Sequence, residues 1–394
     1  MLKLTRPRSA PLIAGILFAL AGFLALNATP APARSQDDCR PANLNTANWA
    51  TDFCNSIVDF SEILVGHPVK GGIPSVTDPA METVPEASAW LSDRSPVIAV
   101  EIEDEARAYP LAILMWHEIA NDEIAGRPVA VTFCPLCNSA VTFDRRVNGE
   151  ALDFGVSGLL RNSDLIMFDR ESESWWQQLT GEGLAGEHAG VFLDIVPSQV
   201  IGFGSFAERY PEGLVMSRAT GYNRQYGANP YSNYDSRPGR PFLFHGEIDP
   251  RLDSAVDHVL AAIIGDDAKA YPFDILRAER VINDRIGDTP IVVFFQGGVA
   301  SALGDHVIDN ARDIGAAGMY QSSIDGKVLR FTANDDGSFA DDETGSTWNA
   351  FGEAIAGELA GSQLNWVHAF PHFWFAWAAF HPDTEVYGMD LSDS

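Results

Sequence analysis

The sequence predicts a β-rich α+β protein built from two tandem homologous repeats of mainly antiparallel strands with short helices. Three observations lead to this prediction. The second half of the chain repeats motifs of the first, the apolar stretches have the length of strands, and a hairpin signal stands at the same place in each half. Because 46% of the 394 residues are hydrophobic, the chain can bury a sizeable core and is predicted to be globular.

The internal repeat is clearest around a shared Ala-Tyr-Pro motif. The segment 105–110 aligns with 267–272, and Asn121-Asp122 then aligns with Asn283-Asp284 at the same offset. Further along, Trp176 aligns with Trp348 at a slightly larger offset, so the halves differ by insertions and deletions. Features present in both halves are therefore predicted to be scaffold, and features present in one half are candidates for function.

The elements of each repeat follow in the same order. Each begins with an apolar strand, at 97–102 or 259–264, and the proline of Ala-Tyr-Pro suits the first turn of a short helix. A second strand is predicted at 129–133 or 291–295. Asn148-Gly149 and Asp325-Gly326 then predict a hairpin in each half, because these residue types tolerate positive φ.

The chain divides into five predicted segments. They are a signal peptide (1–33), an irregular N-terminal lead-in (34–93), repeat 1 with a Cys-x-x-Cys loop (94–219), a connector rich in Tyr, Pro and Arg (220–250), and repeat 2 without the cysteines (251–394). A connector this aromatic is not expected to be a free tether, since disordered linkers contain few aromatic residues. We expect it to pack across the junction of the repeats and to line the site.

The N-terminus predicts export. Lys3, Arg6 and Arg8 precede an apolar run at 11–26, and small residues follow at 31–33, which is the pattern of a secretory signal. An extracytoplasmic location, periplasmic or secreted, follows. An uncleaved N-terminal anchor is the alternative. No transmembrane domain is expected in the mature chain, because its most apolar stretch, 366–380, contains two histidines and a proline.

The net charge of −28 bears on partners. So acidic a surface repels nucleic acid and anionic membranes, which excludes nucleic-acid binding. The expected partner is an unidentified small molecule or protein.

The Cys134-Pro-Leu-Cys137 loop is absent from the second half, and three chemistries fit it. Thiol–disulfide exchange is one, although the residues after the loop read as a strand and not as the helix that lowers a cysteine pKa in redox folds. Metal binding is the second, since Cys-Pro-x-Cys after a strand is typical of a zinc or iron knuckle. A structural disulfide or a pair of buried thiols is the third.

His117 is the predicted third member of this site. Under the repeat alignment it becomes Glu279, so the histidine disappears together with Cys134 and Cys137. Two sulfurs and one imidazole with an open position would suit a zinc or copper ion.

Other candidates are weaker or structural. Asp164, Arg161 and Ser157 belong to a polar passage that could line a catalytic site, and Asp164 has no clear counterpart in the second half. Asp169 and Trp176 recur in both halves, which indicates a shared turn and a core tryptophan. Cys39 and Cys54 are expected to form a disulfide that fixes the lead-in.

Four motifs carry a family resemblance. They are Cys134-Pro-Leu-Cys-Asn-Ser139, the segment from Phe154 to Asp164, Tyr226-Gly-Ala-Asn-Pro-Tyr231, and the segment from Phe373 to Asp383. Together they resemble the uncharacterised prokaryotic family called domain of unknown function 3179. The resemblance covers nearly everything after the lead-in and implies no mechanism. Cys39 and Cys54 lie outside it.

Two functional interpretations remain open at this point. The first is an exported protein with a metal-binding or thiol-redox site in the first repeat. The second is a non-catalytic extracytoplasmic ligand-binding or scaffold protein in which Cys134 and Cys137 only brace a turn. Hydrolysis by carboxylates around Asp164 is a third, weaker interpretation, and the sequence does not decide whether the protein is an enzyme.

Overall fold

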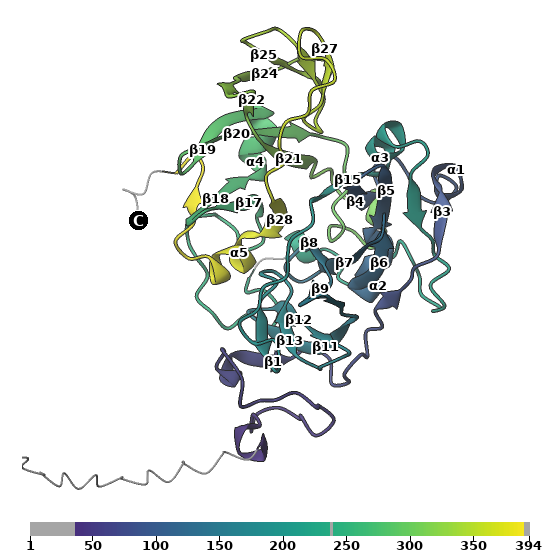
Figure 1. Ribbon diagram of the computed structural model, residues 1–394, viewed down its shortest axis with the longest axis vertical. Coiled ribbons are helices and arrows are strands. Elements are labelled where there is room, and N and C mark those ends of the chain that lie inside the picture. Colours follow the sequence, from purple (N-terminus) through teal and green to yellow (C-terminus); the bar gives the residue numbers. More distant parts are fainter. Residues whose placement is uncertain (1–35, 237–238, 390–394) are drawn as a thin grey trace, which may run out of the picture. The chain divides into compact units, whose positions relative to one another are not determined.

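The computed structural model describes residues 36–236 and 239–389 (Figure 1). The predicted signal peptide, 1–33, lies outside the described residues. The described chain is rich in strands that pair mainly antiparallel, with a few short helices, as the sequence predicts. Within these ranges, no helix has the length and apolar character needed to cross a membrane.

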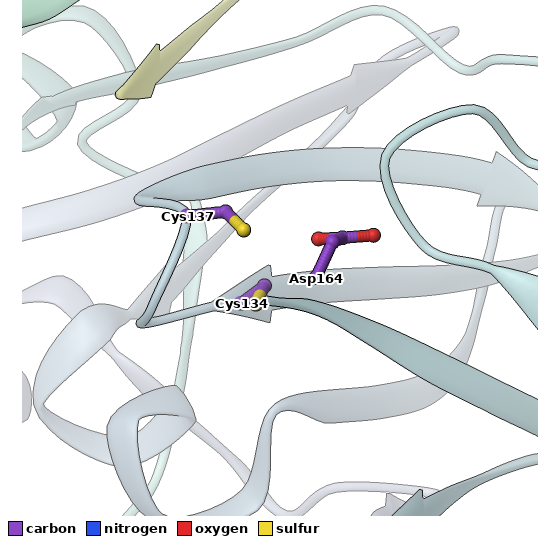
Figure 2. A group of neighbouring side chains, drawn as sticks. All are labelled: Cys134, Cys137 and Asp164. Atoms are coloured by element: carbon purple, nitrogen blue, oxygen red, sulfur yellow. The ribbon is translucent and has the colours of Figure 1, made fainter. Parts of the chain in front are cut away.

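The strands of the first half belong to four sheets, one of them the two-stranded β9–β10 hairpin, and this half has two α-helices. Its elements are β4 (Pro96–Ile102), β5 (Glu105–Pro110), α2 (Leu111–His117), β6 (Ile119–Ile124), β7 (Arg127–Cys134), β8 (Ser139–Asp144), β9 (Arg146–Val147), β10 (Glu150–Ala151), β11 (Phe154–Arg161), β12 (Asp164–Asp169), β13 (Trp175–Gln177), β14 (Gly183–Ala185), β15 (Ser198–Gly202), α3 (Phe203–Arg209) and β16 (Leu214–Met216). The end of β7 and the start of β12 meet at Cys134, Cys137 and Asp164 (Figure 2).

The second half has the same order of elements. They are β17 (His258–Ile264), β18 (Asp267–Pro272), α4 (Phe273–Glu279), β19 (Val281–Ile286), β20 (Thr289–Gln296), β21 (Ala316–Gln321), β22 (Ser323–Ile324), β23 (Lys327–Val328), β24 (Phe331–Ala333), β25 (Phe339–Asp341), β26 (Thr347–Trp348), β27 (Ala354–Ala356), β28 (Ala369–Phe373), α5 (Trp374–Phe380) and β29 (Glu385–Val386). A short 3-10 turn, η4 (Ile308–Asn310), lies in the longer passage between β20 and β21.

The strands also pair alike. In the first half the order β15-β4-β5-β16 includes a parallel pair, β5 with β16, and in the second half the order β28-β17-β18-β29 includes a parallel pair, β18 with β29. The remaining pairs of both sheets are antiparallel. Each half therefore closes its sheet with a strand that arrives after a helix.

Buried side chains make matching hydrogen bonds in the two halves. Tyr109 Oη donates to Asp122 Oδ2 at 2.6 Å, and Tyr271 Oη donates to Asp284 Oδ2 at 3.0 Å. Likewise Trp176 Nε1 donates to Asp169 Oδ2, and Trp348 Nε1 donates to Asp341 Oδ2, both at 2.9 Å. The conserved aspartate and tryptophan of each half thus form a core contact, which supports the scaffold interpretation of Asp169.

The predicted hairpins are present, although their strands continue into separate sheets. Asn148 and Gly149 have φ of 53° and 88° between β9 and β10, and Asp325 and Gly326 have φ of 48° and 80° between β22 and β23. Both residues of each turn have positive φ, as a two-residue hairpin turn requires. β8 pairs with β7, whereas β11 pairs with β12, so the hairpin leads from one sheet to the next.

The connector 220–250 is mostly irregular, with a 3-10 turn η3 (Tyr234–Ser236), and it contacts both halves. Trp116 Nε1 of the first half donates to Ala228 O, and Asn229 N donates to His306 O of the second half. The largest apolar core cluster also contains residues of both halves, among them Phe133 and Phe373. The two halves consequently share one core.

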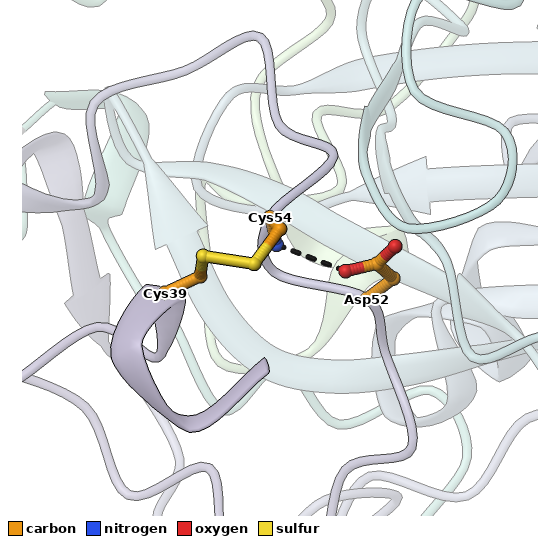
Figure 3. The surroundings of a disulfide bond; sticks show 3 residues. All are labelled: Cys39, Asp52 and Cys54. Atoms are coloured by element: carbon orange, nitrogen blue, oxygen red, sulfur yellow. Dashed lines mark hydrogen bonds between the residues drawn. A yellow bond between two sulfur atoms is a disulfide. The ribbon is translucent and has the colours of Figure 1, made fainter. Parts of the chain in front are cut away.

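The lead-in is irregular, as predicted, and it lies against the first half. Its elements are η1 (Gln36–Cys39), η2 (Phe60–Glu62), β1 (Ile63–Val65), β2 (Val76–Thr77), β3 (Met81–Thr83) and α1 (Val84–Ala87). Cys39 and Cys54 form the expected disulfide, and Asp52 Oδ1 accepts a hydrogen bond from Cys54 N at 3.0 Å (Figure 3). Trp49 and Phe53 pack edge-on against Trp175, which ties this segment to the core around β13.

Replacing Cys39 is predicted to destabilise the lead-in. The disulfide spans a sequence separation of 15 residues, so Cys39→Ser should lower the free energy of unfolding by about 2 to 4 kcal/mol, because the unfolded chain regains loop entropy. Urea unfolding followed by tryptophan fluorescence measures the change. The double variant Cys39→Ser/Cys54→Ser is the control, and its stability should not respond to a reductant. Equal stability of wild type with and without reductant would contradict the prediction.

Candidate metal centre

The turn between β7 and β8 carries both cysteines. Cys134 is the last residue of β7, and Cys137 N donates to Cys134 O at 3.3 Å across a turn that contains Pro135. Asn138 then adopts a left-handed conformation, with φ of 47°, and Ser139 begins β8. Proline fixes one end of the turn and an asparagine tolerates positive φ at the other, so the local sequence brings the two thiols to the same side.

Asp164 enters the same space from a second hairpin. Asn162 and Ser163 have φ of 52° and 68°, and they form a tight turn between β11 and β12 that places Asp164 at the start of β12. The carboxylate is fully buried. Its Oδ2 accepts hydrogen bonds from Gln177 Nε2 at 2.7 Å and from Leu179 N at 3.0 Å. Its Oδ1 accepts no hydrogen bond from a nitrogen or oxygen of the described residues, and the thiols of Cys134 and Cys137 act on this carboxyl group as hydrogen-bond donors.

Cys134, Cys137 and Asp164 form one compact group of donor atoms. Two sulfurs and one carboxylate oxygen lie within 4.8 Å of one another, and all three residues are buried. Figure 2 shows the three side chains directed toward one another. Tetrahedral zinc has bonds of about 2.3 Å to sulfur and about 2.0 to 2.2 Å to oxygen, so ligand atoms around it fall within such a distance of each other. The donor set fits a zinc ion.

Burial sets the protonation of these groups. It raises the pKa of the Cys137 thiol well above its ordinary value and raises that of Cys134. Burial also raises the pKa of Asp164 to about 6, although hydrogen bonds from Gln177 and Leu179 oppose it. A reactive cysteine in an exchange enzyme needs the opposite shift. A cation at the centre would compensate the buried negative charges, because metal ligands are deprotonated when they bind.

The turn with the cysteines is joined to the second half of the chain. Phe373 N, at the end of β28, donates a hydrogen bond to Cys137 O at 2.8 Å. Asn138 Nδ2 lies 3.1 Å from Nδ1 of the buried His258, the first residue of β17. The half without the cysteines therefore supports the loop that carries them.

The structure does not bring His117 into this group. His117 is buried at the end of α2, where its Nδ1 lies 2.7 Å from Pro74 O and its Nε2 lies 2.7 Å from Tyr226 Oη. Both ring nitrogens are thus engaged in hydrogen bonds. The helix ends at Glu118, which has a left-handed conformation with φ of 59°. The change in backbone direction at this residue makes the side chains of His117 and Glu118 point different ways.

Glu118, the residue after His117, is a second acidic group near the cysteines. Its side chain is buried and has no hydrogen bond among the described residues. Burial raises the pKa of Glu118 to about 8, and the charge of Asp164 adds to the increase. The matching left-handed residue of the second half is Arg280, whose guanidinium donates to Asn334 O. A carboxylate at this position is therefore specific to the half with the cysteines.

The other candidate residues have structural partners. Arg161 Nε donates to Glu62 Oε2 at 2.7 Å, and its guanidinium lies over the ring of Phe380. Ser157 Oγ donates to Ile166 O and accepts from Leu159 N at the bulge between β11 and β12. Of the polar passage, Asp164 contributes its side chain to the group with the cysteines, and Ser163 O accepts a hydrogen bond from Cys134 Sγ at 4.0 Å. The signal of Asp164 in the sequence was the Asn-Ser turn before it, which also predicts a hairpin.

The connector covers the site. Ser163 Oγ donates to Phe242 O at 2.5 Å, and Phe242 N donates to Tyr234 Oη at 3.2 Å. Tyr234 belongs to the same apolar core cluster as Cys134 and Cys137, and Tyr231 packs against this cluster. Burial raises the pKa of both tyrosines. The connector therefore packs against the turn that leads to Asp164.

The fold and the site define a β-rich protein with a buried cysteine–aspartate centre at the junction of two similarly built halves. Residues 70–384 match the family described as "Protein of unknown function (DUF3179)", and the chain belongs to this family. The resemblance carried by the four motifs is thereby confirmed. No curated protein and no solved structure matches the chain.

Glu118 is predicted to make stability fall as pH rises. Its pKa is raised from 4.5 to about 8 in the folded state, so the folded chain holds a proton that the unfolded chain releases between these values. The free energy of unfolding should fall over this range. Glu118→Gln should flatten the fall by roughly 2 to 4 kcal/mol, because the variant has nothing to ionise at this position.

Urea unfolding from about pH 5 to about pH 9, with a chelator present, measures this dependence. Glu123→Gln, on the exposed face of β6, is the matched control and should follow the wild type. An identical slope for Glu118→Gln and wild type would show that Glu118 is not held neutral.

Proposed function

We propose that this protein is an extracytoplasmic metal-binding protein whose first half holds a zinc ion. Cys134 Sγ, Cys137 Sγ and Asp164 Oδ1 would be its ligands. The observation that carries the proposal is the position of Asp164. One carboxylate oxygen is fixed by Gln177 and Leu179, and the other is buried in a group with both sulfurs, where the two thiols are the donors that the described residues offer to this carboxyl group.

Zinc is favoured over copper by the donor types. Zinc accepts thiolate and carboxylate ligands together, whereas Cu(I) prefers sulfur donors. Three protein ligands would leave a fourth position for water or a small ligand, which is the arrangement of zinc sites that do more than stabilise a fold. There the ion would act as a Lewis acid on whatever occupies that position. Glu118 is the buried carboxyl group beside the centre that could hold a proton there.

Thiol–disulfide exchange is the competing function, and the Cys-x-x-Cys spacing favours it because the two sulfurs lie in one group. Against it stand the burial of both thiols and their raised pKa values, since exchange needs an accessible thiolate. The non-catalytic scaffold is the other alternative, in which the two thiols only donate hydrogen bonds to Asp164.

We further propose that the two halves are diverged tandem repeats and that the second has lost the centre. The equal order of elements, the paired Tyr–Asp and Trp–Asp contacts and the closing parallel strands support this. β20 ends at Gln296 in the place where β7 ends at Cys134. Arg280 stands where the first half has Glu118. Both changes fall at positions in or beside the centre.

The extracytoplasmic location is part of the same proposal. The Cys39–Cys54 disulfide supports it, because disulfides persist in oxidising compartments. The apolar N-terminal run and its flanking arginines add to this support.

The proposal predicts about one zinc ion per chain. The full chain, purified in the presence of zinc and desalted, should contain this amount by elemental analysis. Cys134→Ser and Cys137→Ser should lose the metal, because each removes one ligand. Asp164→Asn should lower the zinc affinity by more than about tenfold while leaving both thiols in place. Glu150→Gln, in the exposed β9–β10 hairpin, is the control and should keep the metal.

Thiol titration of the same samples separates the alternatives. In the zinc-bound protein, Cys134 and Cys137 should be reduced and should become reactive only after chelation. A wild-type protein that contains no zinc and has these two residues joined as a disulfide would overturn the proposal and favour the redox or structural pair.

A further inference from the structure

A buried histidine of the second half faces the turn that carries the cysteines. His258 is the first residue of β17 and is 7% exposed. Its Nδ1 lies 3.1 Å from Nδ2 of the buried Asn138, the residue that follows Cys137, and this amide nitrogen has no other partner among the described residues. The imidazole therefore contacts the residue beside a cysteine and is not itself one of the clustered donor groups.

The contact defines which ring nitrogen of His258 carries the proton. An amide NH2 group donates and does not accept, so Nδ1 accepts the hydrogen bond and the proton of the neutral ring is on Nε2. Nε2 lies 3.9 Å from Asp235 Oδ2, which is too far for a hydrogen bond but close enough for attraction between the N–H group and a carboxylate. Asp235 thus favours the tautomer that leaves Nδ1 free to accept.

Asp235 is held as a carboxylate by its own partners. Its side chain is fully buried, and Oδ2 accepts hydrogen bonds from Ser301 Oγ at 2.5 Å and from Arg312 Nη2 at 3.3 Å. Oδ1 accepts a hydrogen bond from Ser236 Oγ at 2.8 Å. Burial opposes ionisation, but His258, these hydrogen bonds and the charge of Arg312 together hold the pKa of Asp235 well below its ordinary value. A negative charge therefore lies beside the N–H group of His258.

Aromatic packing fixes the ring of His258. Its centre lies 5.0 Å from the ring centre of Phe373 and 5.9 Å from that of Phe273. Phe373 also donates its backbone N–H to Cys137 O, so one residue contacts both the imidazole and the cysteine turn. The ring is consequently held in the orientation that faces Asn138.

The corresponding position of the first half is a proline. Pro96 begins β4 as His258 begins β17, and the two strands have the same place in the order of elements. Ser95, next to Pro96, donates to Asp309 Oδ1 in the passage that follows β20. Each half thus contacts the other at the passage after β7 or after β20. The imidazole occurs where that passage contains the cysteines.

We infer that His258 is a positioning residue through which the second half holds the cysteine turn. The contacts run from Asp235 through the imidazole to Asn138, whose backbone continues directly from Cys137. Without the acceptor at Nδ1, the buried amide of Asn138 would lose its partner, and an unpaired buried donor destabilises the structure around it. The turn would open more often and expose its thiols. The consequence for zinc rests on the proposed function, whereas the consequence for the thiols does not.

Zinc binding by the full chain measures the first consequence. His258→Leu removes the acceptor and should weaken zinc binding about tenfold, because the turn is then less well ordered before the metal binds. His258→Asn should restore the affinity, since Oδ1 of asparagine occupies the side-chain position of Nδ1 and also accepts. His306→Leu replaces an exposed histidine of the second half and should bind zinc as the wild type does.

Thiol labelling of the chelated protein measures the second consequence and needs no metal. Peptide mass spectrometry follows Cys134 and Cys137 separately. Both should react about tenfold faster in His258→Leu than in the wild type, and His258→Asn should restore the slow rate. Val293→Ala creates a cavity in a core cluster separate from that of the cysteines, so it should lower stability and leave the labelling rate unchanged.

Thermal unfolding shows whether each variant is folded. If His258→Leu is not, His258→Gln replaces it, because the glutamine amide reaches the position of Nε2 and provides no acceptor at that of Nδ1. The inference is overturned if the folded Leu or Gln variant is labelled at the wild-type rate, if His258→Asn does not restore that rate, or if Val293→Ala accelerates labelling equally. A wild type that binds no zinc would end the proposed function alone, since labelling still decides the role of His258.

Discussion

One backbone hydrogen bond, from Phe373 N–H to Cys137 O, joins the second half of the chain to the turn that carries the cysteines. Asn138 and His258 make a second contact beside it. A tight turn of four residues makes few hydrogen bonds or apolar contacts within itself, so it depends on neighbouring elements for its conformation. Here the neighbouring strand β28 and a core common to both halves hold it. The half without cysteines therefore shapes the site although it contributes no donor atom to it.

Local chemistry was visible in the sequence. Asn148-Gly149 and Asp325-Gly326 form turns of the expected kind because positive φ depends on the residues themselves. The recurring Asp and Trp of each half indicated a shared core contact, and the spacing of Cys134 and Cys137 pointed to the turn whose thiols lie beside Asp164. The disulfide was also predicted correctly. Each of these features rests on residues that lie near one another in the chain or recur in both halves.

Long-range placement was not visible. Asp164 reaches the cysteines because the turn between β11 and β12 lies beside the end of β7. A local sequence pattern does not reveal that two segments so far apart in the chain are neighbours. His117 was chosen because it disappears with the cysteines, yet its ring binds Pro74 and Tyr226. The left-handed residue at the end of α2 turns the chain, so Glu118 lies near the centre instead. Strands β16 and β29 pair in parallel with strands far earlier in the chain, and only the assembled sheets reveal this.

The hydrogen bonds made by the connector bear on the rate at which a metal ion could enter or leave the proposed centre. Ser163 and Tyr234 hold the backbone of Phe242 beside the turn that leads to Asp164. If a metal ion occupies the proposed centre and these hydrogen bonds must open to release it, exchange with the surrounding medium would be slow. A metal found in the mature protein would record which ions were available in the compartment where the chain folded, and later changes in that compartment would leave no trace.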